Sequence, residues 1–128
     1  GSEVLGLCND GAINCSTINA RSVITCAGLT SNGTVNINGT LKINGNYSLL
    51  GNNVTFNAGS GTTEIKGNFT TEDLQKEWGS YAYFKMQNDN AYVLIHGDFT
   101  MFSFVSNKGN LTAGTLEIKG KLTEEPSV

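Results

Sequence analysis

The chain has 128 residues, enough for one domain with a hydrophobic core and too few to expect two. Its 8 basic and 11 acidic residues are scattered without a basic run, which argues against nucleic-acid binding. No apolar stretch approaches the roughly 18 residues of a membrane span, so membrane insertion is not expected. With 38% hydrophobic residues, 15% charged residues and 16 glycines, we expect stability from regular stacking rather than from a large core.

The sequence begins with Gly-Ser at residues 1–2, typical of a cloning remnant, and residues 3–38 contain all three cysteines, Cys8, Cys15 and Cys26. One disulfide plus one remaining thiol is possible, and so are three reduced thiols buried as small hydrophobic groups. The CxxC pairs and histidine partners of a zinc site are missing, so a structural role is expected and no metal ligand is predicted.

Residues 3–38 still alternate between apolar and polar side chains, which indicates strands. We interpret this segment as one or two irregular turns ahead of a regular array, with the cysteines helping to fill the interior. Its candidate inward residues are Ile13, Ile18, Val23, Leu29, Val35 and Ile37.

Between residues 39 and 123 a short phrase recurs four times. Its copies are INGNYS from Ile43, IKGNFT from Ile65, IHGDFT from Ile95 and IKGKLT from Ile118. The glycines of these copies are 22, 30 and 23 residues apart. Such a period is typical of repeat architectures, and the alternation within each copy indicates strands.

Aligning the copies predicts columns of equivalent residues, which a coiled parallel sheet would stack on one another. The predicted inward columns are Leu41, Thr63, Val93 and Leu116; Ile43, Ile65, Ile95 and Ile118; and Tyr47, Phe69, Phe99 and Leu122. The predicted outward columns are Lys42, Glu64, Leu94 and Glu117; Asn44, Lys66, His96 and Lys119; and Ser48, Thr70, Thr100 and Thr123.

Each turn offers about three short strands, in the first complete turn residues 41–43, 47–49 and 54–56. Gly45 and the Gly-Asn-Asn at residues 51–53 supply the corners, where a left-handed backbone conformation is expected.

A second alignment concerns the strand that follows these corners. VTF ends at Phe56 and FKM ends at Met86, each nine residues before the next repeat isoleucine. These two stretches are therefore predicted to be equivalent.

The extra residues of the second repeat are predicted to form an insertion at residues 71–83. Thr71 precedes two acidic residues and could cap a short helix, with Leu74 and Trp78 on its apolar edge. We therefore expect a helical or irregular excursion. Its aromatic residues, Trp78, Tyr81 and Tyr83, either close over the sheet or present a binding surface.

A tail is predicted at residues 124–128. Glu124 and Glu125 replace apolar residues there, and Pro126 lacks the N–H group that would continue strand pairing. Such a segment protects the open end of a sheet in part.

The phrases GTLKINGNYSLLGNNVTFNAGSGTTEIKGNFT and DNAYVLIHGDFTMFSFVSNKGNLTAGTLEIKGKLT resemble Gly- and Asn-rich β-helical repeats of large secreted or cell-surface bacterial proteins. These include filamentous-haemagglutinin-like adhesins and polymorphic toxins. The resemblance covers about residues 33–123 and is most characteristic in GTLEIKG; the first 32 residues depart from it. It implies a right-handed parallel β-helix used outside the cell as a stalk, scaffold or presentation module.

The predicted fold class is thus all-β, with residues 1–128 forming one β-solenoid domain of about 3–5 turns and one insertion. The predicted function is a structural or adhesive module, and not an enzyme. Glu64 and Glu117 share an outward column, but neighbouring Lys66 and Lys119 favour solvated charge pairs, and His96 is expected alone on the surface. No catalytic residue, cofactor or metal is predicted.

The alternative function is a carbohydrate-binding or carbohydrate-active β-helix, with its site on the sheet near the insertion. The possible ligand surface comprises Trp78, Tyr81, Tyr83, Thr70 and Thr100. The expected partners are host or cell-surface glycans or proteins, neighbouring repeats of the same chain, or a second copy bound end to end.

Overall fold

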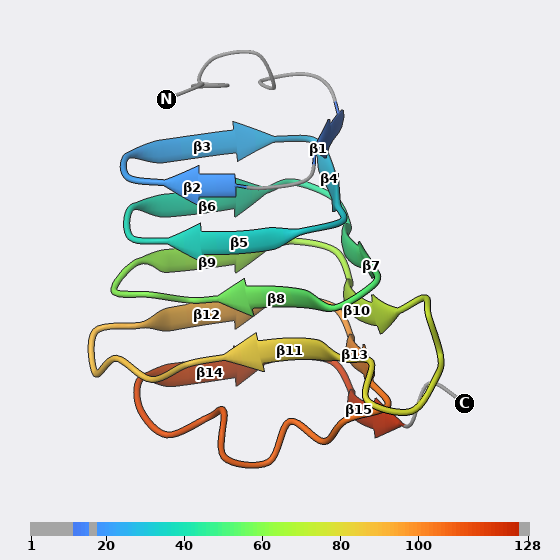
Figure 1. Cartoon of the computed structure of the whole chain (residues 1–128). Coiled ribbons are helices and arrows are strands. Elements are labelled where there is room, and N and C mark those ends of the chain that lie inside the picture. Colours follow the sequence, from blue (N-terminus) through green and yellow to red (C-terminus); the bar gives the residue numbers. More distant parts are fainter. Residues whose placement is uncertain (1–11, 16–17, 126–128) are drawn as a thin grey trace.

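The computed structural model describes residues 12–15 and 18–125, and every regular element in these ranges is a β-strand (Figure 1). Successive strands belong to three different parallel sheets, so the chain passes through the sheets in turn and stacks each coil on the last. This arrangement agrees with the predicted parallel β-helix.

The three sheets are named here A, B and C. Sheet A contains β1 (Ala12–Cys15), β4 (Gly28–Ser31), β7 (Tyr47–Gly51), β10 (Phe69–Asp73), β13 (Phe99–Phe102) and β15 (Leu122–Glu125). Sheet B contains β2 (Ile18–Ala20), β5 (Thr34–Ile37), β8 (Val54–Asn57) and β11 (Ala82–Lys85). Sheet C contains β3 (Val23–Cys26), β6 (Thr40–Ile43), β9 (Thr62–Ile65), β12 (Tyr92–Ile95) and β14 (Thr115–Ile118).

The repeat columns pair in register as the sequence predicts. The four repeat isoleucines follow one another along sheet C, from Ile43 through Ile65 and Ile95 to Ile118. In sheet A the same holds for the column of Tyr47, Phe69, Phe99 and Leu122. Strand alternation turns these side chains inward and their neighbours outward. All of them are buried except Ile118, which is partly buried, and Leu122, which is 51% exposed although the sequence predicts it inward.

Two aromatic ladders fill the middle of the interior. Tyr47, Phe69 and Phe99 stack from sheet A with ring centroids 4.6 and 4.8 Å apart. Phe56 and Phe84 stack from sheet B at 5.3 Å, and their edges meet the sheet A rings. All five rings are fully buried, and stacked and edge-to-face contacts are the favourable geometries for aromatic pairs.

The repeat glycines are required by close packing. A Cβ atom on Gly67 would lie 2.2 Å from Asn46 Oδ1 and 2.7 Å from the Gly45 carbonyl oxygen. Gly97 meets Asn68 and Gly67 in the same way. The expected left-handed conformation is confirmed in the corner at 51–53, where Asn53 has a φ angle of 59°, and is wrong for Gly45, whose φ angle is not positive.

The same corners carry a ladder of side-chain acceptors, two carboxamides and one carboxylate. Asn46 Oδ1 accepts a hydrogen bond from the Asn68 N–H, Asn68 Oδ1 from the Asp98 N–H, and Asp98 Oδ1 from the Lys121 N–H, all at 2.8–2.9 Å. Each copy therefore supplies a side-chain acceptor that holds the corner of the next coil.

The N-terminal strands continue the ladders, because β2 pairs with β5 and β3 with β6. Four predicted inward residues are buried, namely Ile18, Leu29, Val35 and Ile37. The prediction for Val23 is wrong: its side chain is 56% exposed, and Ile24 is buried in its place. The strand β3 runs with Ile24 and Cys26 inward, which puts Val23 on the other face.

The cysteines fall partly outside the described residues. Cys26 is buried in the sheet C ladder, next to Ile43 of β6, in agreement with an interior position. Cys8 and the side chains of Ile13 and Cys15 lie outside what the structure describes, as do the first two residues and Pro126.

The predicted equivalence of Phe56 and Met86 is wrong by two residues, since Phe56 pairs with Phe84. The reason is a longer corner: six residues, 86–91, separate β11 from β12, whereas four, 58–61, separate β8 from β9. Side chains two residues apart point to the same side of a strand, so Phe84 and Met86 are both buried despite the misalignment.

The predicted insertion is irregular, and it is shorter than expected. Strand β10 extends to Asp73 and β11 begins at Ala82, so residues 74–81 form the excursion. The proposed helix cap at Thr71 is wrong, because Thr71 is buried within β10 and pairs with Leu49 and Met101. Ladder hydrogen bonds to strands on both sides outweigh a local capping preference.

The last coil contains no strand of sheet B among its described residues. The loop at 103–114 covers the edge of β11 instead. The Ala82 N–H donates to Ser103 Oγ (3.0 Å), and the Phe84 N–H donates to Asn107 Oδ1 (2.8 Å). Asn107 Nδ2 in turn donates to the Ala82 carbonyl oxygen (3.2 Å), so one buried carboxamide replaces the peptide group of a neighbouring strand.

Candidate functional site

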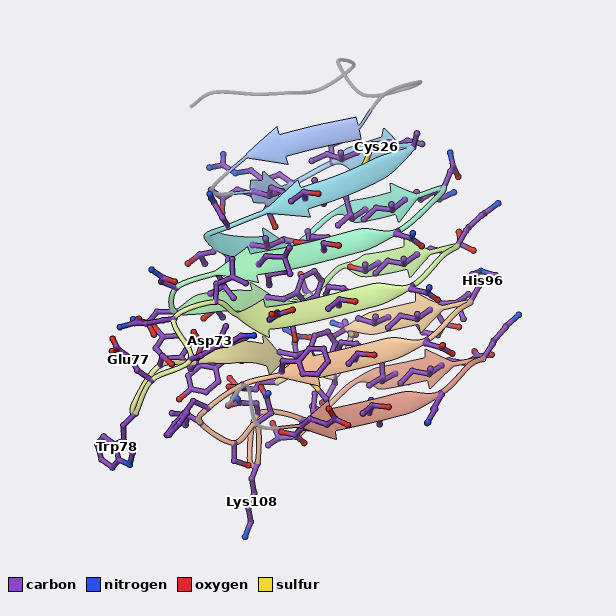
Figure 2. All side chains as sticks on the ribbon, turned by 90° about the vertical axis from the view of Figure 1, so that its right-hand side faces the viewer. Cys26, Asp73, Glu77, Trp78, His96 and Lys108 are labelled. Atoms are coloured by element: carbon purple, nitrogen blue, oxygen red, sulfur yellow. The ribbon has the colours of Figure 1, made fainter. Side chains whose placement is uncertain are left out.

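The predicted ligand residues fall into three groups on different parts of the surface. Thr70 and Thr100 pair side by side on the outer face of sheet A. Tyr81 and Tyr83 stack on each other next to the outer face of sheet B, with ring centroids 4.3 Å apart. Trp78 lies in the irregular segment 74–81, where 88% of it is exposed and it points away from the sheets (Figure 2). The structure therefore does not bring all five residues together.

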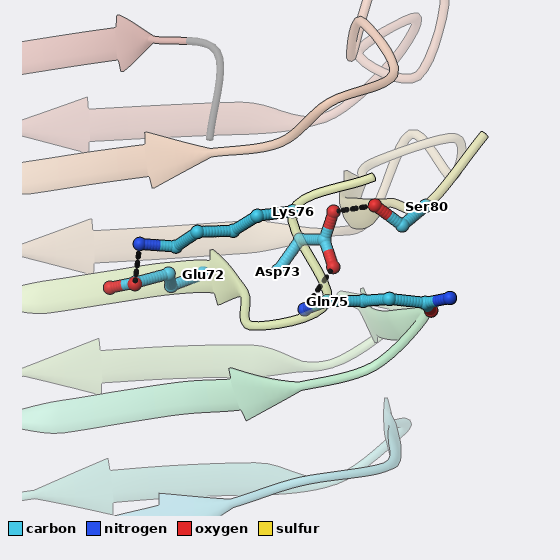
Figure 3. A network of polar contacts seen from close by, with 5 residues as sticks. All are labelled: Glu72, Asp73, Gln75, Lys76 and Ser80. Carbon is cyan, nitrogen blue, oxygen red and sulfur yellow. Dashed lines mark hydrogen bonds and ion pairs between the residues drawn. The ribbon is translucent and has the colours of Figure 1, made fainter. Parts of the chain in front are cut away.

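A buried carboxylate holds the base of the insertion (Figure 3). Asp73, at the end of β10, accepts hydrogen bonds from the Gln75 N–H and from the Ser80 hydroxyl. Lys76 and Gly79 have positive φ angles of 52° and 88°, which turn the chain back toward β11. These contacts hold the two ends of the segment together, while Leu74 and Trp78 within it are exposed.

On the outer face of sheet C the histidine has an acidic partner. His96 Nε2 lies 2.9 Å from Glu64 Oε2, which corrects the expectation that His96 is unaccompanied and gives Glu64 a partner other than Lys66. The His96 hydrogen bond holds the pKa of Glu64 below its usual value, and the charges of His96, Lys66 and Lys42 act in the same direction.

Further along the same face, Tyr92 interrupts the column of Thr62 and Thr115. Its hydroxyl donates to Glu117 Oε2 (3.0 Å), and this hydrogen bond raises the pKa of Tyr92. Both contacts join neighbouring strands, so they support the stack from its surface. Within residues 12–15 and 18–125, no three His, Cys, Asp or Glu side chains are grouped to bind a metal ion.

An asparagine column on the outer face of sheet B was missed by sequence reasoning. Asn19, Asn36 and Asn57 are in register and are followed by Lys85. Asn36 Nδ2 donates to Asn19 Oδ1 (3.1 Å). The signal in the sequence was the single outward Asn in each of INA, TVNI and VTFN, which becomes a column only when the register is known.

A hollow of about 290 Å³ opens beside this column. It is lined by Asn19, Ala20, Arg21, Asn36, Asn38, Asn57 and Gly59. Carboxamide groups both donate and accept hydrogen bonds, and the Arg21 guanidinium adds a donor with positive charge. The lining of the hollow therefore presents both donors and acceptors of hydrogen bonds.

A second hollow, of about 280 Å³, lies at the C-terminal end of the stack. It is lined by Met86, Leu111, Thr112, Ala113, Gly114 and Leu116. Leu111 and Leu122 are 44% and 51% exposed, so this end of the interior is accessible to solvent.

Among the residues described, no helix has the length and apolar character needed to cross a membrane. Comparison of the chain with protein-family models, with curated proteins and with solved structures gave no match.

Proposed function

We propose that the chain is a non-catalytic structural module, serving as a stalk, scaffold or presentation domain of a larger extracellular bacterial protein. In this proposal its coil is right-handed and makes about three to five turns. The likeness of its repeats to those of secreted and cell-surface proteins supports the location. The observation that carries the proposal is the in-register stacking of equivalent residues along all three sheets.

Such stacking suits a spacer. Each added coil extends the stack by about 4.8 Å and buries its apolar face against the previous coil. Apolar columns continue from coil to coil, and the corner side-chain acceptors link successive copies, so copy number determines length. A module of this kind presents whatever is attached to its ends at a fixed separation.

Removal of one complete coil tests this modular design. Deleting residues 45–66 joins Asn44 to Gly67 and brings Phe84 over Val35, since both pair with Phe56 in the intact chain. We expect a cooperatively folded domain with an unchanged β-sheet circular dichroism spectrum, shorter by about 4.8 Å in small-angle scattering.

The matched control deletes residues 45–55, half a coil, which removes β7 and the first two residues of β8 and breaks the order of the sheets. This variant should lose its cooperative unfolding transition. Equal stability of the two deletions would contradict a modular stack.

The catalytic alternative is tested separately, by incubating the intact domain with a panel of polysaccharides and measuring newly formed sugar ends. If the domain is a scaffold, no new sugar ends should form. Release of oligosaccharides above a heat-denatured control would overturn the non-catalytic proposal in favour of a carbohydrate-active β-helix.

A further inference from the structure

The three outer faces of the coil differ in chemistry, although the same alternation creates them. The outer face of sheet C carries Lys42, Glu64, Lys66, His96, Glu117 and Lys119, and opposite charges are paired on it. That of sheet A mixes hydroxyl, acidic and apolar side chains. The outer face of sheet B carries Asn19 on β2, then Thr34, Asn36, Thr55 and Asn57, followed on β11 by Tyr83 and Lys85.

The face of sheet B is partly organised in advance. Asn36 and Asn19 are joined by their carboxamides. Asn57 Oδ1 accepts the Gly59 N–H (3.1 Å), and Asn38 Oδ1 accepts the Ser60 N–H (3.2 Å). These bonds fix the corner that forms one wall of the hollow, so side-chain entropy lost on ligand binding is reduced.

An aromatic platform lies at the other end of the same face. Tyr83 follows Thr55 in register, and the Tyr81 N–H donates to Asn53 Oδ1 (3.2 Å). The stacked Tyr81 and Tyr83 rings are half-buried, and Lys85 Nζ lies 5.4 Å from the centroid of the Tyr83 ring. Tyr83 continues the column of Thr55 and Thr34, whereas the hollow lies beside the neighbouring asparagine column. A line from this platform across β8 and β5 to the hollow therefore runs obliquely over the face.

We propose that this face binds an extended polysaccharide that carries carboxylate groups. Sugar hydroxyls need partners that both donate and accept, which Asn36 and Asn57 provide. The flat C–H face of a sugar packs on an aromatic ring, as Tyr83 offers. The ionised groups along this line are Arg21 and Lys85, which fit carboxylates on the sugar.

The geometry of the stack favours a chain over a single sugar. Neighbouring strands are about 4.8 Å apart, comparable with the length of one pyranose residue. Successive sugars would therefore meet equivalent side chains on successive coils. This inference deepens the adhesive part of the proposed function, because it gives the module a ligand without giving it a reaction.

The test uses the intact domain and polygalacturonate, with uncharged dextran for comparison, in affinity electrophoresis and titration calorimetry. We expect polygalacturonate to bind and dextran to bind at least tenfold more weakly. Asn36→Ala and Tyr83→Ala should each weaken binding roughly tenfold, and Arg21→Gln should weaken it and reduce its salt dependence.

The matched control is the double variant Thr70→Ala, Thr100→Ala, which removes two outward side chains from neighbouring strands of sheet A. It should bind like the parent, and all variants should melt like the parent in circular dichroism. The proposal is overturned if polygalacturonate does not bind, if dextran binds equally well, or if the sheet A variant loses as much affinity as Asn36→Ala.

These outcomes are separate from those of the proposed function. Loss of binding leaves a plain scaffold, whereas release of oligosaccharides from polygalacturonate would contradict the non-catalytic role while leaving the binding face in place.

Discussion

The middle of the stack and its C-terminal end contain the same residue types at equivalent positions, yet the surroundings differ. Ile43, Ile65 and Ile95 are fully buried, whereas Ile118, next in the same column, is only partly buried. Phe99 is fully buried, and Leu122 beside it is 51% exposed. A column residue is thus buried by the coils on both sides, and the last copy contributes less because it has one neighbour.

The three sheets end differently at the C-terminal end of the stack. At sheet B the loop at 103–114 satisfies the edge of β11 through Ser103 and Asn107. Sheets A and C end in β15 and β14, which are the last strands of their ladders among the described residues. Unpaired edges of this kind are where a further strand can add, so the end of sheet B is closed by side chains while the other two sheets present strands.

The largest effect should come from a charge at the middle of the isoleucine column. Ile95→Asp places a carboxylate in a fully buried position without a partner and should unfold the domain, costing more than about 4 kcal/mol. Ile118→Asp should cost about 1–2 kcal/mol, because water reaches that position. Urea unfolding followed by circular dichroism compares the two. Lys66→Ala, on the outer face, should leave stability within about 0.5 kcal/mol. Equal losses for both aspartates would refute the comparison.

Removal of the carboxamide that closes sheet B comes next. Asn107 is 4% exposed, and Asn107→Ala leaves the Phe84 N–H and the Ala82 carbonyl without that partner. We expect a loss of about 2–3 kcal/mol and faster hydrogen exchange at the Phe84 amide. Asn44→Ala, at an exposed position, is the control. An unchanged exchange rate at Phe84 would show that the loop does not cap this edge.

A stabilising change is expected within the stack. Thr63 is fully buried between Leu41 and Val93, and its hydroxyl has no hydrogen-bond partner in the structure. Thr63→Val keeps the shape, removes the unsatisfied group and should raise the free energy of unfolding by about 1 kcal/mol. Thr62→Val, one residue earlier and exposed, should change it by less than about 0.5 kcal/mol. Destabilisation by Thr63→Val would mean that the hydroxyl is satisfied.

The smallest effect concerns pH. Because the folded pKa of Glu64 is lowered, its contribution is complete above the ordinary value of 4.5 and is lost as pH falls toward the lower folded value. The side chain is partly exposed, so the contribution is below about 1 kcal/mol. Urea unfolding of the parent and of Glu64→Gln should differ near neutral pH and converge as pH falls below 4.5 and the folded carboxylate takes up its proton. A constant difference would assign the effect to packing instead.

The repeat made much of the fold predictable. The columns of Ile43 and Tyr47 could be aligned because each coil copies the last, so one correct register gives all of them. Predictions were wrong where a single copy departs from the pattern. Met86 was aligned with Phe56 because two extra corner residues could not be placed from one sequence. Thr71 was assigned to a helix cap because the pairing of β10 with both neighbours is not visible locally.

The candidate surface depended still more on tertiary structure. The sequence leaves open whether Trp78, Tyr81 and Tyr83 close over the sheet or present a binding surface. Only the tertiary structure shows that the two tyrosines stack while Trp78 is exposed and apart from them. Asn36 and Asn57 are 21 residues apart and were not recognised as neighbours. The partnership of His96 with Glu64 was missed for the same reason.

The sequence by itself determined that the chain alternates in short strands, that equivalent residues stack, and which side chains fill the middle columns. The tertiary structure decided the choice of partners across coils: the asparagine column of sheet B, the contact of Glu64 with His96 on sheet C, the buried Asp73 at the base of the insertion and the loop that closes β11. The physical reason is the difference in sequence separation between the two kinds of information. Alternation and repetition are local properties of a sequence, whereas contacts between coils depend on the summed length of every corner that separates them.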